Sequence, residues 1–180
     1  PCAPDWFSSK GRSCEAGEFS VDRAFDLAYN DKIKMFSGGI AMNQPNILII
    51  DAQGGGIGRQ LVAAVRQELP QARITAVGAN GAATAAMLKA GADQGATGEN
   101  AVAVACRKTD VILGPIGIVI ADSMLGEITP RMAAAVAQSG AKRILIPFDH
   151  CDNIIVGVAG GGLKARIREA AAVLAEMLGQ

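Results

Sequence analysis

The sequence predicts an α/β fold, a three-layer sandwich in which helices cover both faces of a mostly parallel sheet. Three observations carry this prediction. Runs typical of strands alternate with runs typical of helices from about residue 46 onward. The strand-like runs are apolar throughout, as in NILII, which is typical of strands covered on both faces. Half of the residues are hydrophobic but only 4% are aromatic, and this composition suits close packing of helices on a sheet.

The expected strands follow the apolar runs of the chain. We place them at 46–51, 73–79, 110–120, 142–148 and 153–159. The last two runs are separated only by DHCD, so the sequence also allows an antiparallel hairpin at one edge of the sheet.

The expected helices are bounded by residues that start or stop helices. Pro70 ends the first helix and Gly91 ends the second. Thr97 is the expected N-cap of the third, and Thr129 caps the fourth with Pro130 in its first turn. These signals place helices at 56–69, 82–92, 97–109, 129–140 and 163–178, of which the last is amphipathic.

A glycine-rich turn lies between the first strand and the first helix. It consists of Gln53, Gly54, Gly55, Gly56, Ile57 and Gly58. In a Rossmann-like domain this turn meets the ligand, because glycines let the backbone approach a phosphate and the helix start offers free N–H groups. The sequence therefore predicts a turn that binds a nucleotide or a phosphorylated small molecule. The plainer interpretation is that the glycines only allow a tight turn and close helix packing.

The turn matches the known nucleotide-binding fingerprints only in part. In the pattern G-x-G-x-x-G, Gly55 and Gly58 take the second and third positions, but Gln53 stands at the first. A site for NAD usually has Asp or Glu at the end of the second strand, where this chain has Asn80. No Gly-Lys-Ser/Thr follows, which excludes a Walker loop. NAD(P) or another nucleotide stays open as the cofactor, and we expect Asn80 to contact it.

Two further segments are candidates for the same site. One contains Thr97, Glu99 and Asn100, which could line a crevice or could simply cap a helix. The other contains Gly114, Pro115 and Gly117, which interrupt an apolar strand and suit either a close approach to a ligand or a plain connection. Because the carboxyl ends of parallel strands meet at one edge of a sheet, we expect these segments and the glycine turn around one cavity.

The catalytic residues cannot be identified from the sequence. Asp122, Ser123 and Glu127 follow the interrupted strand and could reach into the same space. The only histidine, His150, stands next to Cys151, and adjacent side chains in a turn usually diverge. No Ser-His-Asp set or carboxylate pair is readable, so the chain is either an enzyme or a non-catalytic ligand-sensing module.

Composition excludes several classes of partner. The formal net charge is zero and no basic patch with interleaved aromatic residues occurs, so nucleic acid is not expected as a partner. No apolar run reaches the roughly 20 residues that span a membrane. The four cysteines form no C-x-x-C pair, and one histidine cannot complete a zinc site, so no metal is expected. Free thiols and the lack of an apolar leader indicate the cytoplasm.

Three long stretches resemble a small bacterial family known only as a domain of unknown function, number 3842 in that series. They are IIDAQGGGIGRQLV, AVGANGAATAAMLKAGADQGATGENA and DVILGPIGIVIADSMLGEITPRMA. The resemblance covers about residues 46–160. It implies a cytoplasmic Rossmann-like domain, and it brings no established activity and no catalytic residues.

The chain is expected to divide near residue 42. Residues 1–41 are mixed and polar, and we interpret them as an N-terminal extension that is either non-native or partly disordered. Residues 42–180 form the Rossmann-like domain. The alternatives for function are a small NAD(P)-dependent enzyme or enzyme subunit and a sensing module. A homo-oligomer is expected, because the last helix carries more apolar residues than one face needs.

Overall fold

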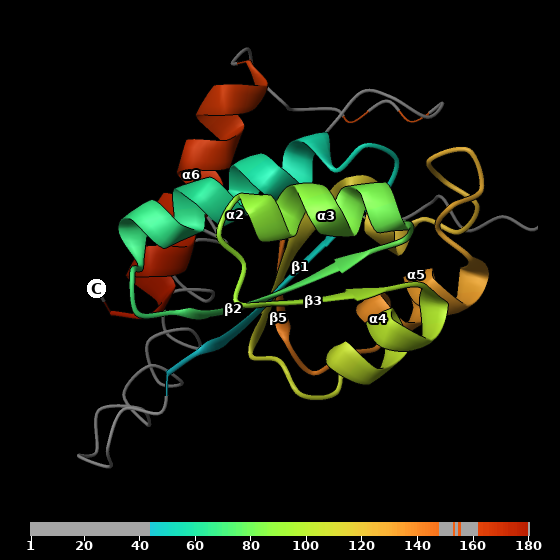
Figure 1. The fold of residues 1–180 in the computed structure, drawn as a ribbon, viewed down its shortest axis with the longest axis horizontal. Helices are drawn as coiled ribbons and strands as arrows, with labels where there is room; N and C mark the ends of the chain where they lie inside the picture. The colour runs from blue at the N-terminus through green and yellow to red at the C-terminus, as the bar shows by residue number, and fades with distance from the viewer. Residues whose placement is uncertain (1–43, 148–152, 154, 156–161, 180) are drawn as a thin grey trace, which may run out of the picture. The chain divides into compact units, whose positions relative to one another are not determined.

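The computed structural model describes residues 44–147, 153, 155 and 162–179. Its strands are β1 (Asn46–Asp51), β2 (Arg73–Gly78), β3 (Gln94–Thr97), β4 (Val111–Pro115) and β5 (Lys142–Ile146). Its helices are α2 (Gly56–Glu68), α3 (Gly81–Lys89), α4 (Glu99–Ala105), α5 (Pro130–Ala137) and α6 (Leu163–Met177), with a short 3₁₀-helix η1 (Ile116–Val119). The elements alternate along the chain, as Figure 1 shows.

The described strands form one parallel sheet in the order β3-β2-β1-β4-β5. The chain moves from β1 outward through β2 to β3 and then returns to the other side of β1 with β4. The β1–β4 pair is therefore the point at which the strand order reverses. Open α/β sheets bind ligands at this switch point, beside the carboxyl ends of the strands. The order confirms the predicted α/β fold with a parallel sheet.

Helices cover both faces of the sheet, so the domain has two hydrophobic cores. Helices α2, α3 and α6 lie on one face, and α4 and α5 lie on the other (Figure 1). Alternate residues of β1 serve the two cores, because successive side chains of a strand point to opposite faces. Ile47 and Ile49 pack with α2, α3 and α6, while Leu48 and Ile50 pack with α4 and α5.

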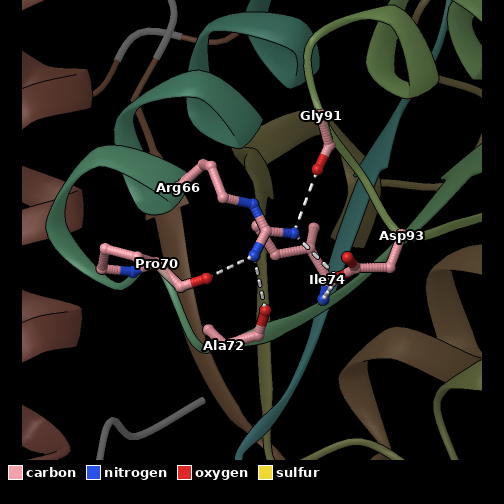
Figure 2. Close-up of polar contacts among 6 residues, drawn as sticks. All are labelled: Arg66, Pro70, Ala72, Ile74, Gly91 and Asp93. Atoms are coloured by element: carbon pink, nitrogen blue, oxygen red, sulfur yellow. Dashed lines mark hydrogen bonds and ion pairs between the residues drawn. The ribbon is translucent and has the colours of Figure 1, made fainter.

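An arginine network joins the connection between α2 and β2 to the connection between α3 and β3 (Figure 2). The guanidinium of Arg66, near the end of α2, donates to the carbonyls of Pro70 (2.9 Å), Ala72 (2.9 Å) and Gly91 (3.0 Å). It also pairs with Asp93 at 2.8 Å, whose Oδ2 accepts from the amide of Ile74. The planar guanidinium can serve several acceptors in fixed directions. It thereby fixes the α2–β2 connection to the turn between α3 and β3.

The structure corrects the prediction that residues 97–109 form one helix capped by Thr97. Residues Gln94–Thr97 form β3, which pairs with β2, and α4 is capped by Gly98. The Thr97 hydroxyl lies 2.7 Å from the hydroxyl of Thr84, on α3. Thr97 therefore ends a strand instead of capping α4.

The expected strand at 110–120 is shorter than predicted. It ends at Pro115, and the chain turns at once into η1, because Pro115 leads into that helix with an extended backbone. The second strand of the expected hairpin, 153–159, lies almost wholly outside the described residues. Residues 1–43 also lie outside them, so the division near residue 42 stays a prediction. The caps Thr129 and Pro130 of α5 are as predicted.

Candidate functional site

A cavity of about 840 Å³ opens at the carboxyl ends of β1 and β4. The last residues of these strands, Asp51 and Pro115, both line it. The glycine turn, the first turns of α2, the loop after β4 and the start of α6 supply the other lining residues: Ala52, Gln53, Gly54, Gly56, Ile57, Arg59, Gln60, Gly117, Met124, Leu125 and Leu163. The cavity therefore lies at the switch point, and we call it the switch-point cavity.

Two glycines of the turn present bare backbone to this cavity. A Cβ atom added to Gly54 or to Gly56 would meet no other atom within 4 Å, and both residues line the cavity. Among the described residues, neither amide N–H has a hydrogen-bond acceptor. Gly56 is also the first residue of α2, where backbone amides lack helical partners. These two amides are therefore available to a ligand.

The other two glycines of the turn are required by packing. Gly55 has a φ of +67°, and a Cβ there would lie 2.8 Å from the backbone of Ala83 on α3. A Cβ on Gly58 would lie 2.5 Å from Met87 Sδ and 2.8 Å from Asp51 Cβ. Both glycines hold α2 close to α3 and β1. The plainer interpretation of the turn thus holds for Gly55 and Gly58, and neither lines the cavity.

The buried carboxylate of Asp51 occupies the start of α2. Its Oδ1 accepts from the amide of Ala52 at 2.8 Å, its Oδ2 accepts from the amide of Gly58 at 2.6 Å, and the residue is 4% exposed. Desolvation by burial raises the pKa of Asp51 above its usual range, against the lowering effect of these amides, and the charge of Glu127 raises it further. The Gly58 amide is therefore already bound by the Asp51 side chain.

Gln53 is held on both sides in a left-handed conformation. Its φ is +52°. Its amide donates to Glu127 Oε2 at 2.8 Å, and its carbonyl accepts from Asn80 Nδ2 at 2.8 Å. Asn80 Nδ2 also donates to Glu127 Oε2 at 2.6 Å. Asn80 thus contacts the turn itself, and its Oδ1 caps α3 by accepting from the amide of Ala83.

The loop between η1 and α5 forms the apolar wall of the cavity. Three of its non-glycine residues, Asp122, Met124 and Leu125, have φ values of +62°, +56° and +60°. The left-handed region is costly for such residues, and a cluster of them favours a functional role. Leu125 lines the cavity while 93% of it is exposed to solvent. Ser123 Oγ donates to the carbonyl of Gly117 at 2.6 Å and fixes the base of the loop.

Arg59 brings a positive charge to the cavity. It lies on the first turns of α2, it is exposed, and it has no ion pair or side-chain hydrogen bond within the part of the chain that the structure describes. The described ion pairs are those of Arg66 with Asp93 and of Arg131 with Glu99. The guanidinium of Arg59 is therefore free to bind an anionic group of a ligand.

A comparison with protein families places these residues in a shared domain. The model of the family described as "Domain of unknown function (DUF3842)" matches residues 46–179. The chain belongs to this family. No curated protein matches the chain. The matched range runs from β1 to α6, so every residue that lines the switch-point cavity lies within the DUF3842 domain.

The DUF3842 domain brings some of the sequence-predicted residues together and leaves others apart. Gln53, Gly54, Gly56, Ile57, Pro115 and Gly117 line the switch-point cavity. Thr97 and Asn100 line a separate groove of about 630 Å³ between α4 and the sheet. Glu99 is held by the hydroxyl of Thr129 (2.7 Å) and by Arg131 (3.0 Å), contacts that lower its pKa.

Gly114 is needed for strand packing and does not line the cavity. A Cβ there would lie 2.5 Å from the carbonyl oxygen of Ile50 on the neighbouring strand. The interruption of the apolar run at this position therefore reflects close packing between β1 and β4. Pro115 and Gly117 line the cavity, so a contact with a ligand stays open for these two residues of the 114–117 segment.

Sequence reasoning missed Asp51, Arg59, Met124 and Leu125. An acidic residue two positions before the glycine turn and a basic residue directly after it are visible signals for the first two. No group of three or more His, Cys, Asp or Glu side chains suited to a metal ion occurs among the described residues. None of the described helices is both long and apolar enough to cross a membrane.

Proposed function

We propose that the DUF3842 domain binds a small ligand with a phosphate group, such as a nucleotide, in the switch-point cavity. The observation that carries this proposal is the pair Gly54 and Gly56, whose amides have no acceptor among the described residues and whose α-carbons face open space. Amides at the start of a helix attract anions, because they point outward and add to the positive end of the helix dipole. Arg59 supplies a cation beside them.

The charges around the cavity favour a ligand with one phosphate. The amides of Gly58 and Gln53 already bind Asp51 and Glu127, so fewer amides are free than a dinucleotide site offers. The Glu127 carboxylate beside the turn opposes a second phosphate by like-charge repulsion, and the cavity offers one free arginine. Apolar contact with a base or another flat ring is available from Ile57, Met124 and Leu125. A mononucleotide therefore fits this site better than NAD(P).

Catalysis on the bound ligand is the second candidate function, and Asp51 is the observation that favours it. A carboxyl group with a raised pKa beside a cavity is a frequent feature of enzyme sites. Both of its oxygens, however, accept hydrogen bonds from backbone amides, which favours a positioning role. We therefore place binding or sensing first and an NAD(P)-dependent enzyme, or an enzyme subunit, as the alternative.

Thermal unfolding with paired ligands tests the proposed function. A ligand that binds only the folded chain raises the melting temperature in proportion to the logarithm of its concentration above Kd. We expect AMP to raise the melting temperature more than adenosine, which lacks the phosphate, and more than NAD. An equal rise with AMP and adenosine, or no rise with AMP or inorganic phosphate at millimolar concentration, would contradict the proposal. Chemical conversion of AMP during the incubation would favour the alternative that the domain is an enzyme.

A further inference from the structure

Gln53 begins the glycine turn in a conformation that its side chain disfavours. A φ of +52° is in the left-handed region, where a residue with a Cβ is uncommon. Gly54, which lines the switch-point cavity and whose amide has no acceptor among the described residues, follows directly. The direction in which the Gly54 amide points therefore depends on the backbone conformation of Gln53.

Two side chains from other segments hold Gln53 in that conformation. Glu127, from the loop before α5, accepts a hydrogen bond from the Gln53 amide at 2.8 Å, and Asn80, the N-cap of α3, donates to the Gln53 carbonyl at 2.8 Å. The two side chains are also joined to each other at 2.6 Å. The Asn80 side chain is fixed in turn by the amide of Ala83 at the start of α3. Both polar groups of the Gln53 backbone are therefore bound.

We propose that Glu127 and Asn80 are positioning residues that set the glycine turn for ligand binding by holding Gln53 in its left-handed conformation. They act through Gln53, because neither lines the cavity. The part of this inference that concerns ligand binding rests on the proposed function. Glu127 also belongs to the loop that carries Met124 and Leu125, so the same contact fixes the apolar wall relative to the turn.

The charge of Glu127 makes the inference testable, because charge and position predict opposite effects. A carboxylate near the cavity repels phosphate, so its removal alone would tighten phosphate binding. Loss of the contact with Gln53 weakens binding if Glu127 acts by position. Glu127→Gln removes the charge but keeps an oxygen that can accept from the Gln53 amide. Asp122→Asn is the matched control, because it removes a charge from the same loop and leaves Gln53 untouched.

The decisive experiment combines Glu127→Ala with Gln53→Gly. Glycine adopts a φ of +52° without a steric penalty, so a Gln53→Gly chain should no longer need Glu127. By calorimetry we expect Glu127→Ala to weaken AMP binding about tenfold with Gln53 present and less than about threefold with glycine there. Glu127→Gln and Asp122→Asn should keep or tighten binding. Equal losses in both backgrounds, or tighter binding by Glu127→Ala, would overturn the inference.

A ligand-free measurement separates this inference from the proposed function. Without ligand, the effects of the two substitutions on the urea midpoint of unfolding should not be additive. Glu127→Ala removes the contact that holds Gln53 in its left-handed conformation, and Gln53→Gly removes the steric penalty of that conformation. If no variant binds AMP or phosphate but this coupling is present, the proposed function fails and the positioning role stands. Strictly additive midpoints would show that Glu127 does not hold Gln53, whatever the ligand data show.

Discussion

Gly55 and Gly56 are neighbours, but only Gly56 has room for a larger side chain. A Cβ on Gly56 would enter open space at the cavity wall, whereas one on Gly55 would meet the backbone of Ala83. We expect Gly56→Val to remove AMP binding, because its side chain would cover the free amides, while the melting temperature changes little. Calorimetry and thermal unfolding of the same sample measure both quantities.

Gly55→Ala is the control for this substitution. It places a Cβ in a left-handed residue and 2.8 Å from a backbone atom, so we expect a loss of about 2 kcal/mol or more in the free energy of unfolding. AMP binding at wild-type affinity by a folded Gly56→Val chain would show that the phosphate does not lie at this turn.

Cys106 is predicted to be inert in the folded chain. Burial raises the pKa of the Cys106 thiol from 9.0 to about 11, because the thiolate loses its hydration. At pH 8 only about one thiol in a thousand is then ionised, and the thiolate is the reactive form. We expect iodoacetamide to label the peptide that contains Cys106 quickly in urea and hardly at all without it, as measured by mass spectrometry. Equal rates would contradict the buried position.

At the scale of single residues, the sequence predicts the glycine turn but not how its members divide. The strand–glycine–helix order is visible, and so is the cap formed by Thr129. The different roles of Gly55 and Gly56 depend on α3, which packs against only one of them. We expect Asn80 to contact a ligand, and the structure adds hydrogen bonds from Asn80 to Gln53 and to Glu127. The contact with Glu127 spans 47 residues, and no local pattern reveals it.

Among the elements, the junction of α2, β2 and β3 depends on Arg66 and Asp93. Desolvation raises the pKa of Asp93, but hydrogen bonds from the Ile74 amide and from Arg66 outweigh it and bring the pKa below its usual 3.8. A carboxylate with a lowered pKa stabilises the fold above its unfolded pKa, and this stability is lost as the pH falls through the folded pKa.

We expect Asp93→Asn to be less stable than the wild type at pH 7. The difference should shrink as the pH falls below about 4, because the wild-type carboxyl group then takes up a proton. Urea unfolding midpoints at pH 7 and pH 3 measure this difference. A constant difference between the two pH values would mean that the ion pair and the charged hydrogen bonds contribute nothing.

Most elements could be predicted from the sequence because their signals are local. The apolar run of β1 and the amphipathic pattern of α6 are long and clear. Strand β3 was missed, because QGAT is short, contains glycine and is exposed at the sheet edge, so it shows neither an apolar run nor alternation. Pairing with β2 makes it a strand, and that information is not in the segment itself.

For the molecule as a whole, the structure changes the reason to expect a homo-oligomer. Ile167 and Leu174 of α6 are buried in the core of the same chain, and Val173 (41% exposed) is the one large apolar side chain that the described part of this helix exposes strongly. We propose the exposed edge strand β3 as the contact instead. Its residues carry no charge, and it lies beside Leu88 (41% exposed) and the groove that contains Val104 (39% exposed). Uncharged edge strands pair readily with a second chain.

Light scattering at micromolar concentration tests this assembly. We expect a mass of at least twice 18.4 kDa for the wild type and a lower mass for Ala96→Lys, which puts a charge on β3. A wild-type mass near 18.4 kDa would refute the oligomer. An unchanged mass for Ala96→Lys would move the contact away from β3.

The proposed function requires that a phosphate group binds the free amides of the glycine turn. A ¹H–¹⁵N NMR titration with AMP tests it most directly, because each amide reports on its own surroundings. We predict that the Gly54 and Gly56 amide resonances shift with AMP and less with adenosine, and that the Gly54 resonance does not shift in Gly56→Val. Shifts confined to the groove between α4 and the sheet, or equal shifts with adenosine, would contradict the claim.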